Sequence, residues 1–166
     1  MKLTAIFASV VICGAFAVST AQAKATSLPA QCLKASKIIC ISKTDRKVRL
    51  VENGKVVLSM DARFGDNRGP GFRTAEGSFT VTRKDPMSWS FPFKVYMPFA
   101  IYFRGGEAIH YSYAFKKDGY GDGSPNYASH GCVNTRDMVK IERLFNAVSE
   151  DLPNQPGTGT PVLIYH

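Results

Sequence analysis

Two short β-prone runs joined by a tight turn constrain the fold of this chain most strongly. Residues 47–51 and 55–60 are rich in valine and leucine, and Asn53-Gly54 lies between them. Asparagine and glycine both tolerate the positive φ angles that a two-residue hairpin turn requires. The sequence therefore predicts a β-hairpin over residues 47–60.

Further β-prone runs recur along the chain, separated by segments rich in glycine and proline. Strands are predicted at three of these runs, residues 38–42, 78–82 and 162–165. A second hairpin is predicted across Gly105-Gly106, joining residues 99–104 to residues 107–111. His110 lies near the end of its second strand.

One stretch, residues 135–150, has helical rather than β periodicity. Its apolar residues recur three or four positions apart, at Met138, Ile141, Leu144, Phe145 and Val148. Thr135 is the expected N-cap. The chain contains no internal repeat and no linker, so we expect one domain that is mainly β, with this helix packed on the sheet.

Two long segments are predicted to be irregular. Residues 113–128 are polar and rich in glycine. Residues 85–98 combine three prolines with four aromatic side chains, Trp89, Phe91, Phe93 and Tyr96. Because proline at this frequency argues against a central strand or a helix, we expect either a packed surface loop or a lid over a site.

The first 23 residues have the layout of a cleavable secretory signal. Lys2 precedes an apolar run over residues 3–18, and Ala21-Gln22-Ala23 forms a small-residue cleavage site. Ile12 before Cys13 does not suit a lipidated cysteine. We therefore expect a signal peptide at residues 1–23, a single domain at residues 24–166, and no transmembrane segment after cleavage.

Charge and cysteine content restrict the partners of an exported chain. The formal net charge is +8, but the basic residues are scattered rather than clustered, which favours an anionic cell envelope over nucleic acid. A generally basic soluble surface is the alternative.

Cys32 and Cys40 are close enough in sequence to form a disulfide in an oxidising compartment, which would leave Cys132 as a free thiol.

Residues 129–134, Ser-His-Gly-Cys-Val-Asn, concentrate reactive groups. Cys132 could act as a nucleophile with His110 or His130 as its base, and N–H groups around Gly131 could stabilise an oxyanion. The helix predicted to follow would favour a thiolate at Cys132. Zinc binding by Cys132, His130 and His110 lacks a clear fourth ligand, and a buried structural cysteine is the third interpretation.

With His110 upstream, this stretch resembles the signature of the L,D-transpeptidase catalytic domain, the YkuD-like family. The segments RKVRLVENGKVVLSM, TAEGSFTV, PFAIYFRGGEAIHYS and TPVLIY follow in the order of the family. The resemblance implies a YkuD-like β-sandwich or mixed sheet with a helix beside the catalytic cysteine. Two departures are Tyr111, where the family usually has a small residue, and Ala75, where a proline is common.

The resemblance also implies a role for each residue of the site. Cys132 would be the nucleophile and His110 the general base, oriented by the backbone carbonyl of Tyr111. His130 and Gly131 would shape the oxyanion pocket. Other residues are assigned to the substrate side, namely Ser129, Asn134, Tyr111 and Tyr96. Asn134 would either brace the loop or meet the substrate.

The implied reaction is acyl transfer on peptidoglycan stem peptides in the periplasm or cell envelope, without a metal or organic cofactor. Cys132 would attack the third residue, expel the terminal D-alanine, and pass the acyl group to a stem peptide, an envelope-protein lysine, a D-amino acid or water. Carbapenems would acylate the same thiol. Alternatives are a sortase-like cysteine acyltransferase or peptidase, and a catalytically silent envelope-binding module.

Overall fold

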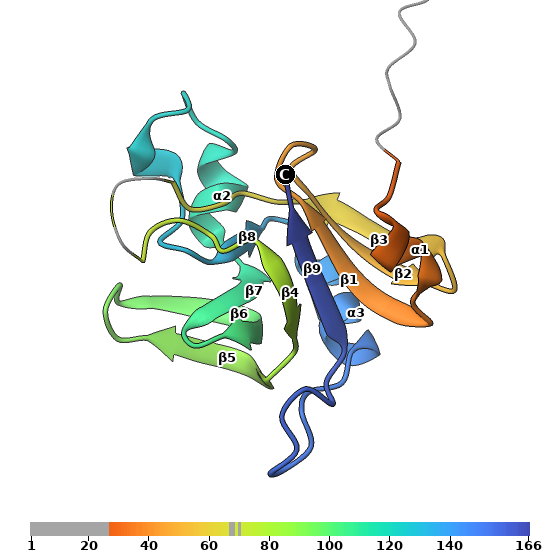
Figure 1. Cartoon of the computed structure of the whole chain (residues 1–166). Helices are drawn as coiled ribbons and strands as arrows, with labels where there is room; N and C mark the ends of the chain where they lie inside the picture. Colours follow the sequence, from red (N-terminus) through yellow and green to blue (C-terminus); the bar gives the residue numbers. More distant parts are fainter. Residues whose placement is uncertain (1–26, 67–68, 70) are drawn as a thin grey trace, which may run out of the picture.

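Two β-sheets form the framework of the computed structural model, which describes residues 27–66, 69 and 71–166. Figure 1 shows them side by side. The five-stranded sheet has the order β3-β2-β1-β9-β4 and the four-stranded sheet the order β5-β6-β7-β8. The first sheet contains β1 (Lys37–Ser42), β2 (Lys47–Glu52), β3 (Lys55–Asp61), β4 (Gly77–Thr80) and β9 (Pro161–Tyr165). The second contains β5 (Arg83–Ser90), β6 (Val95–Arg104), β7 (Glu107–Tyr111) and β8 (Val133–Thr135).

Both hairpins predicted from the sequence are confirmed. Strands β2 and β3 pair antiparallel across Asn53 and Gly54, whose φ angles are 48° and 73°. Strands β6 and β7 pair across Gly105-Gly106. The two sheets are mixed, because β1 pairs parallel with β9 and β7 pairs parallel with β8. The mainly β class and the mixed sheets agree with the prediction.

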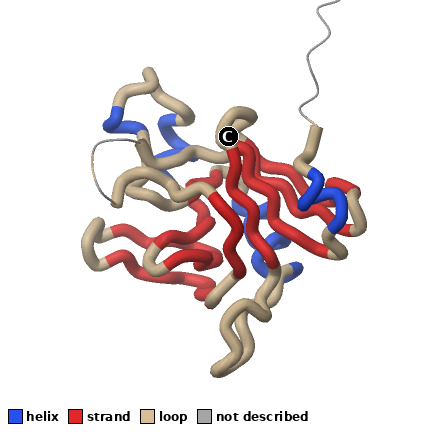
Figure 2. The backbone as a smooth tube through the Cα atoms, in the orientation of Figure 1, coloured by secondary structure: helices blue, strands red, loops and turns tan. Residues whose placement is uncertain are grey.

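One hydrophobic core is shared by both sheets and by the helix α3 (Met138–Ala147). Ile41 of β1, Ile109 of β7 and Ile141 of α3 are all fully buried within it. Figure 1 and Figure 2 show α3 behind the larger sheet, with long loops at the upper left and at the bottom of the view. Burial of this apolar face is the main source of stability for the domain.

The start of α3 corrects the predicted N-cap. Thr135 belongs to β8, where its hydroxyl donates to the His110 carbonyl at 3.2 Å, and Asp137 caps the helix by accepting from the Lys140 N–H at 3.1 Å. A strand therefore separates Cys132 from the helix. The helix dipole falls off within one turn, so it does not favour a Cys132 thiolate as expected.

The proline-rich aromatic segment is a hairpin rather than an irregular loop. Pro86 lies on β5, which is an edge strand, and Pro98 lies on the part of β6 that extends beyond β7. Neither proline has to donate to a second neighbouring strand, which removes the objection raised from the sequence. Phe99 has a φ angle of 54°, which kinks β6 at the point where it leaves β7.

A short helix and a 3₁₀ turn lie between β7 and β8. The helix α2 (Tyr113–Asp118) and a 3₁₀ turn (Pro125–Tyr127) occupy a stretch that was predicted to be entirely loop. Ser112 caps α2 by accepting from the Phe115 N–H at 3.2 Å, and Phe115 is buried. The helix is too short for its periodicity to appear in the sequence.

The helix α1 (Ala30–Lys34) is joined to β1 by a disulfide between Cys32 and Cys40. Both cysteines are fully buried in a small second core. The predicted signal peptide, residues 1–23, lies outside the described residues. In the described part of the chain, no helix has the length and apolar character needed to cross a membrane.

Removing this disulfide should destabilise the domain without affecting chemistry. The bridge spans eight residues, and closing a loop of this size contributes about 2–3 kcal/mol through the unfolded state. A Cys32→Ala/Cys40→Ala variant should show that loss in urea unfolding. Its Cys132 should still react with iodoacetamide at the wild-type rate, and a slower reaction would contradict a purely structural role.

Candidate active site

The site lies where β7 and β8 run parallel at the end of the smaller sheet. His110 is paired with Asn134 across the two strands, and Cys132 directly precedes β8. The parallel register therefore brings together an imidazole and a thiol that are 22 positions apart in the sequence. His110 and Cys132 line the same cavity.

The loop carrying Cys132 is fixed through the carbonyl of that residue. This oxygen accepts from the Ser129 hydroxyl and, at 3.3 Å, from the Thr74 hydroxyl. Gly131 adopts a φ angle of 99°, and a Cβ there would lie 3.0 Å from the Gly71 carbonyl oxygen. The turn before Cys132 thus requires glycine both for its backbone angle and for the close approach.

His110 is held in one orientation. Its Nδ1 lies 2.7 Å from the Tyr111 carbonyl oxygen, as the resemblance implied. Because a carbonyl can only accept, Nδ1 carries the proton, and Nε2 of the neutral ring is free to act as a base. Burial lowers the pKa of His110 to about 4, against the smaller opposing effect of the Tyr111 hydrogen bond. The ring is therefore neutral at pH 7.

Burial of His110 predicts stability that is lost in acid. Between its folded pKa near 4 and its usual value of 6.5, the unfolded chain binds more protons than the folded chain. The full contribution is present above pH 6.5, and about 3 kcal/mol is lost as the pH falls to 4. Urea unfolding at pH 7 and pH 4 measures this loss. A His110→Gln variant should lose less stability over the same interval, and equal losses would contradict the assignment.

Cys132 is a thiol rather than a preformed thiolate. Burial raises the pKa of Cys132 above its usual value, the nearby charge of Glu107 adds to this effect, and a backbone hydrogen bond with Ala108 opposes it. The surroundings of Cys132 in the free protein therefore do not favour the thiolate that was expected from the sequence. Cys132 and His110 are both neutral and line the same cavity.

Cys132 borders two cavities. The first cavity, of about 470 Å³, contains His110, Asn134, Ser129 and Tyr96 in its lining. The second cavity, of about 660 Å³, is also lined by Cys132 and is bordered by charged residues, Arg83, Arg104 and Glu107. Cys132 can therefore be reached from both cavities.

The β5–β6 hairpin and His130 form a wall common to both cavities. The His130 ring stacks on Phe93 with 4.1 Å between ring centroids and contacts Phe72 at 5.2 Å. Trp89 and Tyr96 pack edge to face at 4.7 Å on the same hairpin. His130 is exposed and held by aromatic contacts, so its position suits the cavity wall better than the base.

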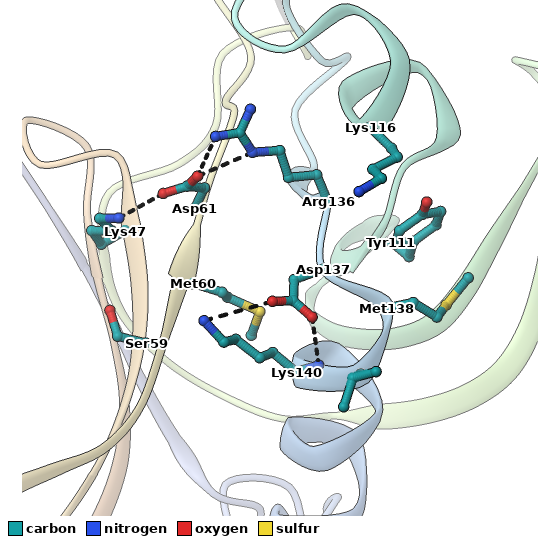
Figure 3. A pocket seen from close by; sticks show the side chains of 11 residues that line it. Lys47, Ser59, Met60, Asp61, Tyr111, Lys116, Arg136, Asp137, Met138 and Lys140 are labelled. Carbon is teal, nitrogen blue, oxygen red and sulfur yellow. Dashed lines mark hydrogen bonds and ion pairs between the residues drawn. The ribbon is translucent and has the colours of Figure 1, made fainter.

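A third cavity, called the rear cavity below, has a volume of about 680 Å³ and lies between β3 and the start of α3 (Figure 3). The Tyr111 side chain lines this rear cavity and neither of the cavities at Cys132. Its contact with substrate therefore stays a prediction, and the part of Tyr111 that contacts the site in this structure is its carbonyl, which holds His110. Asp61 accepts from Lys47 at 2.6 Å and also from Arg136, which ties β2 and β3 to the segment that follows β8.

Several residues at the site had no signal in the sequence. Arg63 and Asn134 exchange backbone hydrogen bonds of 2.9 and 2.8 Å, and Arg63 lines the first cavity. Glu107 accepts from Arg104 at 2.8 Å and from the Ala75 N–H at 3.2 Å. Their roles arise from contacts between distant segments, which no local pattern encodes.

Among the described residues, no group of three His, Cys, Asp or Glu side chains could hold a metal ion.

Comparison with protein families accounts for this arrangement. A model described as the L,D-transpeptidase catalytic domain, YkuD, matches residues 36–164. The chain belongs to this family. A comparison with curated protein sequences finds no significant match.

Solved L,D-transpeptidases share the fold. The enzyme from Stackebrandtia nassauensis is 25% identical with a TM-score of 0.59, and the match covers 80% of this chain and 57% of that one. The enzyme from Xylanimonas cellulosilytica is 28% identical with a TM-score of 0.55, and the match covers 79% of this chain and 61% of that one. LdtMt1, solved in complex with imipenem, is 21% identical with a TM-score of 0.59, and the match covers 78% of this chain and 59% of that one. This L,D-transpeptidase family member thus spans about three fifths of the length of those chains.

Proposed function

We propose that this protein is an exported L,D-transpeptidase that acts on peptidoglycan stem peptides through a thioester at Cys132. The observation that carries the proposal is the neutral His110, fixed by the Tyr111 carbonyl in the tautomer that leaves Nε2 unprotonated, in the same cavity as Cys132. A nucleophile, an oriented base and a surrounding cavity are what acyl transfer requires.

In the acylation step, Sγ of Cys132 attacks the carbonyl carbon of the third stem residue as its proton passes to Nε2 of His110. The carbonyl oxygen becomes an oxyanion, which backbone N–H groups around Gly131 and Cys132 would stabilise. The carbon–nitrogen bond to D-alanine then breaks, and the leaving amine takes the proton from His110. A thioester remains, and His110 is neutral again.

In the transfer step, an acceptor amine attacks the thioester carbonyl and gives a proton to His110. The carbon–sulfur bond breaks, and the thiolate recovers the proton from the imidazole. The second cavity also borders Cys132, which leaves room beside the thioester for a second molecule. The acceptor amine would come from a stem peptide, a protein lysine or a D-amino acid, with water as the hydrolytic alternative.

Two features of the sequence support a location outside the cytoplasm. Residues 1–23 have the layout of a secretory signal, and the Cys32–Cys40 disulfide suits an oxidising compartment. We assign the domain at residues 24–166 to the periplasm or cell envelope, where its substrate lies. Its wall affinity would come from the catalytic domain and its basic charge.

The test is incubation of the protein with purified disaccharide-tetrapeptide, followed by mass spectrometry. We expect D-alanine release, a thioester adduct on the intact protein, and new products whose masses identify the acceptor. Imipenem should add once to the protein, as the complex of the structural neighbour LdtMt1 suggests. No D-alanine release above that of heat-denatured protein, together with no adduct, would refute the proposal.

A further inference from the structure

Arg63 is a buried cation with unused hydrogen-bonding capacity. Its side chain is 8% exposed, Nη1 donates to the Gly119 carbonyl at 3.1 Å, and the guanidinium packs over the Phe115 ring. The buried Nε has no hydrogen-bond partner. No ion pair joins Arg63 to a carboxylate anywhere in residues 27–66, 69 or 71–166, and Asp118 acts on it only at longer range.

Such an arrangement is costly for folding. A buried charge without a counter-charge loses hydration that nothing restores, and burial accordingly lowers the pKa of Arg63. Other cations of this chain show the usual arrangement: in the rear cavity of Figure 3, Lys47 and Arg136 pair with Asp61, and Lys140 pairs with Asp137. Arg63 stands apart from them.

The position of Arg63 links it to the catalytic pair. Its two backbone hydrogen bonds with Asn134 hold it beside β8, two residues after Cys132. Residues that exchange both bonds project side chains to the same face, and both residues line the first cavity with His110 and Cys132. Among the described residues that line it, Lys94 is a second cation and none is Asp or Glu.

We propose that Arg63 binds a carboxylate of the donor stem peptide in the first cavity and so determines donor specificity. This inference rests on the proposed function, because it names the group that the same site recognises. Guanidinium matches a carboxylate with two parallel hydrogen bonds, and the bound anion would supply the missing counter-charge. Two sources share this chemistry: the terminal carboxylate of the leaving D-residue and the side-chain carboxylate of the third-position diamino acid.

The test combines three donors with four proteins. The donors are the tetrapeptide with free carboxylates, its terminal D-alaninamide analogue, and an analogue amidated on the diamino acid side chain. The proteins are wild type, Arg63→Met, Arg63→Lys and a control, Arg49→Met. Arg49 also has a buried unpartnered nitrogen, but it pairs with Asp45 on the larger sheet and borders none of the three cavities.

We expect amidation of one carboxylate to lower kcat/KM of the wild type about 10- to 100-fold, the scale of a charged hydrogen bond. Arg63→Met should show the same loss in kcat/KM with the intact donor, and amidation of the bound carboxylate should cause no further loss in this variant. Arg63→Lys should recover part of the activity, and Arg49→Met should behave as wild type. The carboxylate bound by Arg63 is the one whose amidation lowers the activity of wild type but not that of Arg63→Met.

Two results would overturn the inference while leaving the proposed function intact. One is a wild-type kcat/KM that neither amidation changes. This measurement uses no variant, so it does not depend on the folding of Arg63→Met. The other is an Arg63 variant whose deficit is equal on all three donors. If wild type instead releases neither D-alanine nor D-alaninamide and forms no adduct, the proposed function itself fails.

Discussion

Replacing Cys132 with alanine should lower the rate of D-alanine release by at least about 10⁴-fold, the scale on which enzymes lose activity without their nucleophile. Cys132 is the only free cysteine of the described residues and lines both cavities, so no other thiol can take over the covalent step. The same variant should form no adduct with imipenem. Mass spectrometry of the intact protein and of the released peptides measures both effects.

The matched control for this prediction is the Cys32→Ala/Cys40→Ala variant. It removes two sulfurs from the protein but leaves the only free cysteine of the described residues in place. It should be less stable and fully active under folding conditions, whereas Cys132→Ala should unfold much as wild type does, because only one half-buried sulfur is lost. Equal release by wild type and Cys132→Ala would exclude the thioester mechanism.

The parts of the fold that could be predicted from sequence are those fixed by local rules. Asn53-Gly54 imposes a turn with positive φ angles, and the periodicity around Ile141 distinguishes a helix from a strand. His110 and Cys132 could be paired because the motif and its resemblance to a family linked them. The hydrogen bond from His110 to the Tyr111 carbonyl followed from the same resemblance.

The remaining features depend on tertiary contacts. Pro98 fits within β6 because β7 ends before it, and the sequence near Pro98 does not specify where β7 ends. The helix begins at Met138 because Thr135 is used in a parallel strand pair with β7. Arg63 approaches Asn134 across 71 positions, so its place in the cavity could not be read from either segment.

Electrostatic behaviour was the least predictable property of the site. The helix predicted to follow Cys132 suggested a thiolate, yet burial favours the neutral form of both groups: it raises the pKa of Cys132 and lowers that of His110. Desolvation is the largest cause of both shifts in the free protein. We therefore expect the thiol to lose its proton to His110 as it attacks the substrate, when the oxyanion site can stabilise the negative charge that forms.

Replacing His110 with glutamine should lower the acylation rate about 10²- to 10⁴-fold, the usual contribution of a general base. The pH dependence should change as well. Because His110 stays neutral down to about pH 4, wild-type acylation should be level between pH 5 and 8 and fall only in stronger acid. Without the imidazole, only the thiolate fraction reacts, so the variant should gain about tenfold per pH unit up to the raised pKa of Cys132.

Single-turnover acylation, with no acceptor amine, is the measurement that isolates this effect from titration of the acceptor. His130→Gln is the matched control, since His130 lies against Phe93 on the cavity wall and should leave the shape of the profile unchanged. A wild-type profile with a step near pH 6.5 would indicate a titrating imidazole and contradict a buried neutral base. Parallel profiles for wild type and His110→Gln would show that the thiol loses its proton without His110.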